Sequence, residues 1–121
     1  QGGNPLELIR TSPYGNTLTK DFAIKAMQEE QLGKRGTTDF LAISFSSTDY
    51  VGHSFGPQSI ELEDTYLRLD QDIAELLIYL DKQYGKDQVL VFLTADHAVA
   101  EMYAMSDDNR FLEVTYQNGE K

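Results

Sequence analysis

Residues 39–57 read DFLAISFSSTDYVGHSFGP, and our interpretation of the fold starts from this stretch. Its first part, Phe40–Phe45, is almost continuously apolar, which is typical of a strand buried on both faces of a parallel sheet. From Ser46 to Pro57 the residues are small and polar and include glycine and proline. We therefore expect a strand near residues 39–46, followed directly by a loop.

A second apolar run, Val89–Leu93, predicts another buried strand near residues 88–94. Between the two runs, residues 59–83 have apolar residues at helical spacing, which predicts a long helix. Ser59 is suited to cap its start and Gly85 to end it. Its expected apolar face consists of Tyr66, Leu69, Ile73, Leu76, Leu77 and Leu80. Strand, helix and strand form a β-α-β unit with parallel strands and a right-handed crossover, so the predicted fold class is α/β.

The flanking segments have weaker patterns. Residues 1–17 contain several glycines and prolines and are expected to be an irregular lead-in. A helix is predicted from Thr19 to about Gly33, because apolar residues recur every three or four positions. Residues 112–116 alternate like a half-exposed strand, and Asn118-Gly119 is typical of a hairpin turn.

Composition excludes some functions. The chain has 121 residues and a net charge of −10, which disfavours binding to nucleic acid or to an anionic membrane surface. The absence of cysteine rules out disulfides and thiolate metal sites. No apolar run approaches the roughly 20 residues of a membrane span, and no signal peptide is visible. Because the chain begins with Gln1 rather than Met, we expect a processed or excised piece of a longer protein.

Two pairs of polar residues follow the predicted strands. Asp49 and His53 come after the first strand, and Asp96 and His97 come after the second. Ligands of open parallel sheets bind beyond the carboxyl ends of the strands, so we expect all four side chains at one edge. Carboxylate and imidazole ligands suit zinc, with manganese or other transition metals as alternatives. Two metals about 4 Å apart can hold a phosphoryl group.

A plainer interpretation exists for each pair. An aspartate after a strand often caps a turn. Adjacent residues such as Asp96 and His97 converge only if the backbone bends there, because neighbouring strand residues point to opposite faces. Other polar residues are expected to be structural. Ser46, Ser47 and Thr48 are expected to form turns, and Asp70, Asp72 and Asp81 to line the exposed face of the long helix.

The stretch Ser47-Thr48-Asp49-Tyr50-Val51-Gly52-His53-Ser54-Phe55-Gly56-Pro57, followed by Glu63-Asp64-Thr65-Tyr66 and Thr94-Ala95-Asp96-His97, resembles the alkaline phosphatase superfamily. It is most similar to the bacterial phosphate-irrepressible alkaline phosphatases and to the type I phosphodiesterase/nucleotide pyrophosphatases. The resemblance covers about residues 13–97. It implies that residues 1–121 are part of one alkaline-phosphatase-like domain, with a parallel sheet flanked by helices, in a longer enzyme.

The resemblance also implies a two-zinc site. Asp49 and His53 match two ligands of one zinc, and Asp96 and His97 match two ligands of the other. The remaining ligands and the nucleophile, usually a threonine, have no match in this chain, and Ala98 stands where relatives usually have glycine. We therefore expect the chain alone to be inactive and to bind little or no zinc.

The expected activity of the parent enzyme is hydrolysis of small phosphate monoesters in the periplasm or outside the cell, again as the resemblance implies. Two alternatives stay open. The first is that the parent enzyme is a phosphodiesterase/nucleotide pyrophosphatase, whose substrates are diesters. The chain would otherwise be a non-catalytic acidic interaction domain.

Overall fold

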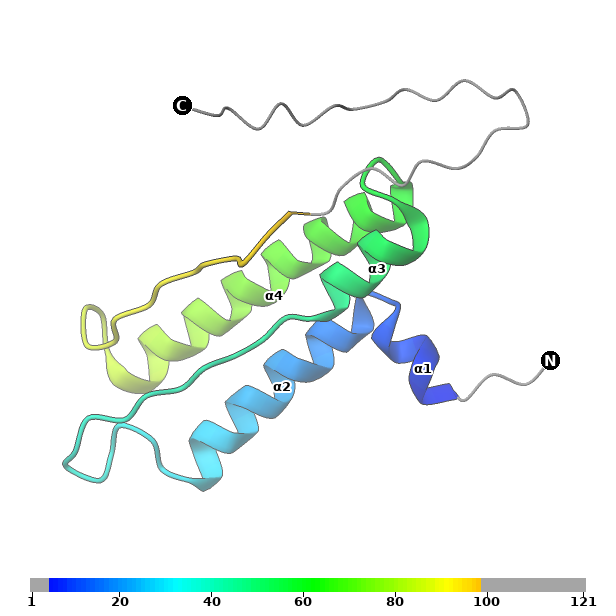
Figure 1. The fold of residues 1–121 in the computed structure, drawn as a ribbon. Helices are drawn as coiled ribbons and strands as arrows, with labels where there is room; N and C mark the ends of the chain where they lie inside the picture. The colour runs from blue at the N-terminus through cyan, green and yellow to red at the C-terminus, as the bar shows by residue number, and fades with distance from the viewer. Residues whose placement is uncertain (1–4, 99–121) are drawn as a thin grey trace, which may run out of the picture.

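The computed structural model describes residues 5–98, and these contain four helices. They are α1 (Pro5–Arg10), α2 (Tyr14–Glu29), α3 (Ser47–Phe55) and α4 (Ile60–Tyr84). Helices α2 and α4 lie side by side and run in the same direction, while α3 packs near the beginning of both (Figure 1). None of the helices in the described part combines the length and the apolar character needed to cross a membrane. The predicted strand at 112–116 and the turn at 118–119 lie outside the described residues.

The ends of α4 follow the sequence prediction closely. The Ser59 hydroxyl accepts a hydrogen bond from the backbone N–H of Leu62 at 3.2 Å, which caps the helix start. Gly85 follows Tyr84 with a φ of 93°, a left-handed value that glycine adopts without steric cost. The expected face is less buried than predicted, however. Leu76 is buried, but Tyr66 and Leu77 are 53% and 41% exposed.

An irregular lead-in was expected over residues 1–17, but residues 5–17, the part of it that the structure describes, are mostly helical. Pro5 opens α1, and Pro13 directly precedes α2. Proline is well suited to a helix start, because its missing N–H would have no helical acceptor there and its φ is already helical. The prolines thus begin helices instead of preventing them. Helix α2 also begins earlier than the predicted Thr19–Gly33 helix. It ends earlier as well, because Gln31 already has a left-handed φ of 51°.

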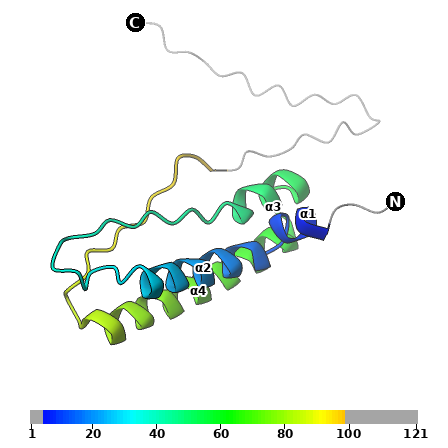
Figure 2. The ribbon, with the colours of Figure 1, turned by 90° about the horizontal axis from the view of Figure 1, so that it is seen from below.

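The two predicted strands are extended but unpaired within residues 5–98, where all regular secondary structure is helical. Residues 40–45 and 89–93 run in the same direction, as a β-α-β unit requires (Figures 1 and 2). Neither belongs to a hydrogen-bonded ladder, so the predicted parallel sheet is not formed in this part of the chain.

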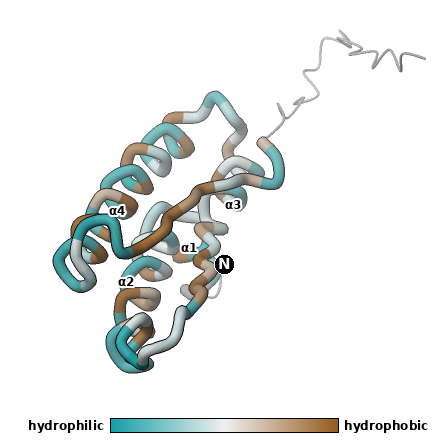
Figure 3. The backbone as a smooth tube through the Cα atoms, turned by 90° about the vertical axis from the view of Figure 1, so that its left-hand side faces the viewer, coloured by the Kyte–Doolittle hydropathy of each residue, from teal (hydrophilic) through white to brown (hydrophobic). Residues whose placement is uncertain are grey.

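The exposure of these segments gives the physical reason. Figure 3 shows the apolar 89–93 segment crossing the outside of the helices. Leu90 and Leu93 are 88% and 78% exposed, and Phe40 is 79% exposed. A strand in a sheet needs a neighbour, because its N–H and C=O groups form hydrogen bonds with those of another strand whose axis lies about 4.8 Å away. The described residues do not bring such partners to either segment.

A polar cluster joins α2 to α4. The ammonium group of Lys20 lies 2.6 Å from the Glu75 carboxylate and 3.3 Å from that of Asp72. The Thr17 hydroxyl donates to the other oxygen of Asp72 at 2.9 Å. The hydrogen bond to Glu75 is the main cause of a raised Lys20 pKa, which burial partly offsets. Asp72 was predicted to be solvent-exposed and is instead buried, because Lys20 and Thr17 of α2 cover it.

Replacing Asp72 should weaken the pairing of α2 with α4. In Asp72→Ala, the buried Lys20 ammonium keeps its exposed partners but loses the buried one, and the Thr17 hydroxyl loses its acceptor. We expect the free energy of unfolding in urea to fall by about 2 kcal/mol. Asp70→Ala, on the exposed side of the same helix, should change it by less than about 0.5 kcal/mol. Equal effects of the two substitutions would contradict this account.

The pH dependence of stability follows from the raised pKa of Lys20. A group whose pKa is raised by folding contributes fully below its unfolded pKa, about 10.4 for lysine. This contribution is lost as the pH rises through the higher folded value. Because Glu75, the main cause of the shift, remains in Asp72→Ala, the stability difference between wild type and this variant should stay constant from about pH 7 to pH 9 and decrease only as the pH rises through the raised pKa of folded Lys20. Urea unfolding at a series of pH values measures it.

Candidate metal centre

Asp49 and His53 lie on a helix, not in the loop that the sequence predicted. They are four residues apart on α3, so their side chains share one face, with Asp49 Oδ1 3.3 Å from His53 Nε2. Gly56, with a φ of 92°, ends the helix. Its start is stabilised from outside, because Asn16 Oδ1 of α2 accepts a hydrogen bond from Ser47 N–H. Helical spacing brings this carboxylate and this imidazole together.

One oxygen of Asp49 lacks a hydrogen bond within residues 5–98, although the Asp49 side chain as a whole is 43% exposed. Asp49 Oδ1 is buried and has no hydrogen-bond partner within the described residues, although His53 Nε2 is close. A buried carboxylate oxygen without a donor is costly, and a cation would remove that cost. Two donor atoms bound to one tetrahedral zinc, each about 2.1 Å from the metal, lie about 3.4 Å apart. The observed separation of 3.3 Å therefore fits a shared zinc ion.

Asp96 and His97 form a second pair. The backbone bends at Asp96, as convergence of these neighbours requires, and Asp96 Oδ2 lies 3.5 Å from His97 Nε2. His97 Nδ1 lies 3.3 Å from the carbonyl oxygen of Ala98. A neutral ring with its proton on Nδ1 would donate to this carbonyl and leave a lone pair on Nε2, whereas the Asp96 carboxylate can accept a hydrogen bond from Nε2 in the other tautomer. The first of these tautomers is the one that offers Nε2 to a metal.

The two pairs are not assembled into one centre. Among residues 5–98, no three His, Asp or Glu side chains lie close enough together to hold a metal ion. The edge of a parallel sheet was expected to bring all four side chains together. Without a ladder, the spacing of the two extended segments is not held at the distance between strands. The metal role of the four residues stays a prediction.

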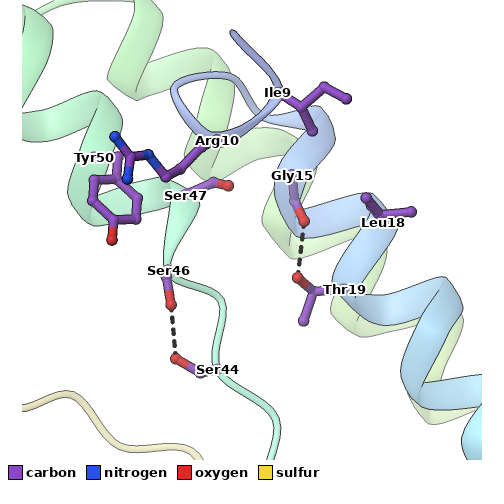
Figure 4. Close-up of a pocket in the computed structure, with 9 residues that line it drawn as sticks. All are labelled: Ile9, Arg10, Gly15, Leu18, Thr19, Ser44, Ser46, Ser47 and Tyr50. Atoms are coloured by element: carbon purple, nitrogen blue, oxygen red, sulfur yellow. Dashed lines mark hydrogen bonds between the residues drawn. The ribbon is translucent and has the colours of Figure 1, made fainter. Parts of the chain in front are cut away.

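The hydroxyl residues before Asp49 make structural contacts. Ser44 and Ser46 share a hydrogen bond of 2.9 Å, and Thr48 Oγ1 accepts one from Asn16 Nδ2 at 2.9 Å. A cavity of about 280 Å³ lies beside the start of α3, with the Arg10 guanidinium 4.4 Å from the centre of the Tyr50 ring (Figure 4). None of the four predicted metal ligands lines it. The cavity and the candidate metal centre are therefore different places.

Sequence reasoning missed Asn16. It lies early in α2, is 1% exposed, and makes both of its side-chain hydrogen bonds to residues more than thirty positions away. No local pattern around residue 16 indicates such a partner. The contact depends on how α2 and α3 meet in space, so a periodicity or capping argument could not have found it.

Residues 9–118 of this chain match a protein-family model described as "Type I phosphodiesterase / nucleotide pyrophosphatase". This match covers most of the 121 residues and includes both Asp-His pairs. The chain belongs to the type I phosphodiesterase/nucleotide pyrophosphatase family, which agrees with the resemblance drawn from its motifs.

Three bacterial relatives are similar over most of this chain. Alkaline phosphatase PhoV of Synechococcus elongatus is 57% identical over 78% of the chain, and alkaline phosphatase PafA of Elizabethkingia meningoseptica is 58% identical over 77%. A Myroides odoratus protein named calcium-transporting ATPase is 59% identical over 80%. The chain spans only 17–18% of the length of these relatives.

A solved structure is also similar. The crystal structure of wild-type alkaline phosphatase PafA matches with a TM-score of 0.64 and 58% sequence identity. The match covers 65% of this chain and 15% of that one. The arrangement of helices and extended segments described above is therefore one that a small part of PafA shares.

The isolated chain should bind zinc weakly. Each Asp-His pair offers two protein ligands, whereas structural zinc sites need four and catalytic sites usually have three. We expect dialysis against a chelator to remove added zinc from the 121-residue chain completely. Metal analysis of the dialysed protein measures this. Stoichiometric zinc that survives the chelator would show that the ligand count is wrong.

Proposed function

We propose that this chain is part of a metal-dependent phosphoester hydrolase, active in the periplasm or outside the cell, that cleaves phosphate monoesters at a two-zinc site. Asp49 and His53 bind one zinc in this proposal, and Asp96 and His97 bind the other. The observation that carries it is the spacing within each pair, 3.3 and 3.5 Å, which matches two donors on one zinc. The names of PhoV and PafA support a monoesterase.

The helix gives the first pair its chemical value. When bound, two zinc ions stabilise the negative charge of the phosphoryl oxygens and lower the pKa of the attacking group. Asp49 contributes a carboxylate with one oxygen that has no hydrogen-bond donor among the described residues, and His53 contributes a nitrogen one helical turn away. Rigid placement matters because small errors in ligand position weaken the stabilisation of developing charge.

The second pair has a backbone acceptor beside its histidine. With the proton on Nδ1, His97 can donate to the Ala98 carbonyl and leave the lone pair of Nε2 for a metal ion. Asp96 then contributes the charge that offsets the second cation. Ser44, Ser46 and Thr48 form side-chain hydrogen bonds with protein groups, and Ser47 is buried. We therefore place the attacking hydroxyl elsewhere in the longer enzyme.

Loss of one ligand in the complete enzyme should remove most of its activity. In Asp49→Ala or His53→Ala, we expect kcat for p-nitrophenyl phosphate to fall by about 10²–10⁴-fold, because each ligand supports transition-state stabilisation of several kcal/mol. Asp81→Ala is the matched control, since this exposed aspartate of α4 is in neither pair. It should retain wild-type kcat. The 121-residue chain by itself should show no hydrolysis above background, with or without zinc.

Two outcomes would count against this proposal. Wild-type turnover in a full-length double variant, His53→Ala with Asp96→Ala, would mean that these residues are structural. A higher kcat/KM for bis(p-nitrophenyl) phosphate than for the monoester would assign the enzyme to the phosphodiesterases instead. The same protein preparations serve for both substrates.

A further inference from the structure

Helix α3 begins without a cap of its own. Ser46 precedes it in a helical backbone conformation, and its side chain makes no capping hydrogen bond. The first N–H groups of a helix lack acceptors within the helix, so something else must satisfy them. Asn16 of α2 does this for Ser47, whose N–H donates to Asn16 Oδ1 at 3.2 Å. The same side chain donates from Nδ2 to Thr48 Oγ1 at 2.9 Å.

The neighbouring glycine lets the two helices come close enough for this contact. A Cβ atom at Gly15 would lie 2.0 Å from Ser47 Oγ and 2.8 Å from the Ile9 carbonyl oxygen. Both distances are shorter than real carbon–oxygen contacts, so a larger residue would displace the Ser47 side chain of α3, the Ile9 backbone of α1, or both. Figure 4 shows the Ser47 side chain directed towards Gly15. Gly15 and Asn16 together therefore set where α3 begins.

The position of α3 decides the position of the ligand pair. Asp49 is in the first turn of the helix, directly after the two residues that Asn16 holds, and His53 follows one turn later. Asn16 is 1% exposed, and both of its polar atoms that can reach α3 are used there. A shift of the first turn would move the Asp49 carboxylate as one body with the backbone.

We infer that Asn16 is a positioning residue for the Asp49–His53 metal-ligand pair, an inference that rests on the proposed function. It acts through Ser47 and Thr48 and touches neither metal nor substrate. Outer contacts that orient metal ligands commonly change metal affinity by about 10–100-fold when removed. The adjacent residue on α2 offers a control, because Thr17 makes its hydrogen bond to Asp72 of α4 and none that involves α3.

The test compares three variants by two measurements that do not depend on turnover. Amide hydrogen exchange of Ser47 is measured in the metal-free 121-residue chain, and zinc affinity is measured in the complete enzyme by competition with a chelator. In Asn16→Ala we expect exchange at Ser47 to be about tenfold faster and zinc binding about tenfold weaker. Asn16→Asp should restore both, because a carboxylate accepts from Ser47 N–H and from the Thr48 hydroxyl. Thr17→Val should leave both unchanged.

The outcomes separate this inference from the proposed function. If Asn16→Ala and Thr17→Val change zinc affinity equally, Asn16 has only a general structural role and the inference fails. If Asp49→Ala keeps wild-type zinc affinity, the proposed function fails first. If Asp49→Ala loses zinc while Asn16→Ala binds it normally, the inference alone fails.

A milder variant covers the case in which Asn16→Ala does not fold. Thr48→Val removes the acceptor of Asn16 Nδ2 and leaves the contact with Ser47 N–H in place. The loss of one hydrogen bond should weaken zinc binding about threefold. Wild-type zinc affinity in a folded Thr48→Val variant would overturn the inference.

Discussion

The first part of α2 makes polar side-chain contacts with both α3 and α4, and the packing of the three helices depends on these contacts. Asn16 bonds to the start of α3, while Thr17 and Lys20 bond to Asp72 and its neighbours on α4. Asn16, Lys20 and Asp72 are themselves buried, so breaking one of these contacts leaves a charge or a donor without a partner where water has little access. Such contacts tolerate few alternative arrangements. They therefore define how the three helices meet.

The apolar surface of the described region contrasts with this ordered polar interior. The buried apolar side chains in this region are Ala23, Met27, Val51, Leu62 and Leu76. Most of the strongly apolar residues, including those of 89–93, are exposed. Large exposed apolar areas on a protein surface usually mark an interface.

The two Asp-His pairs form locally, but their position relative to each other depends on the tertiary structure. The Asp49–His53 pair is formed within one helix, and the Asp96–His97 pair is formed at one bend, so each exists independently of the other. Bringing the pairs together requires the two extended segments to be held at a fixed spacing, and a ladder is the usual means. This explains why the described residues hold two separate Asp-His pairs and no group of three possible metal ligands.

The sequence by itself determined the order of extended segment, helix and extended segment, both ends of α4, and the placement of an Asp-His pair after each apolar run. These features depend on local chemistry: apolar runs, a serine cap and a glycine with positive φ. Only the tertiary structure decided that residues 47–55 are helical, that Asp72 is buried and that the apolar runs stay unpaired. Each of these depends on a partner distant in the chain. Asn16 supplies the cap of α3 and Lys20 covers Asp72, whereas neither extended segment finds a neighbouring strand.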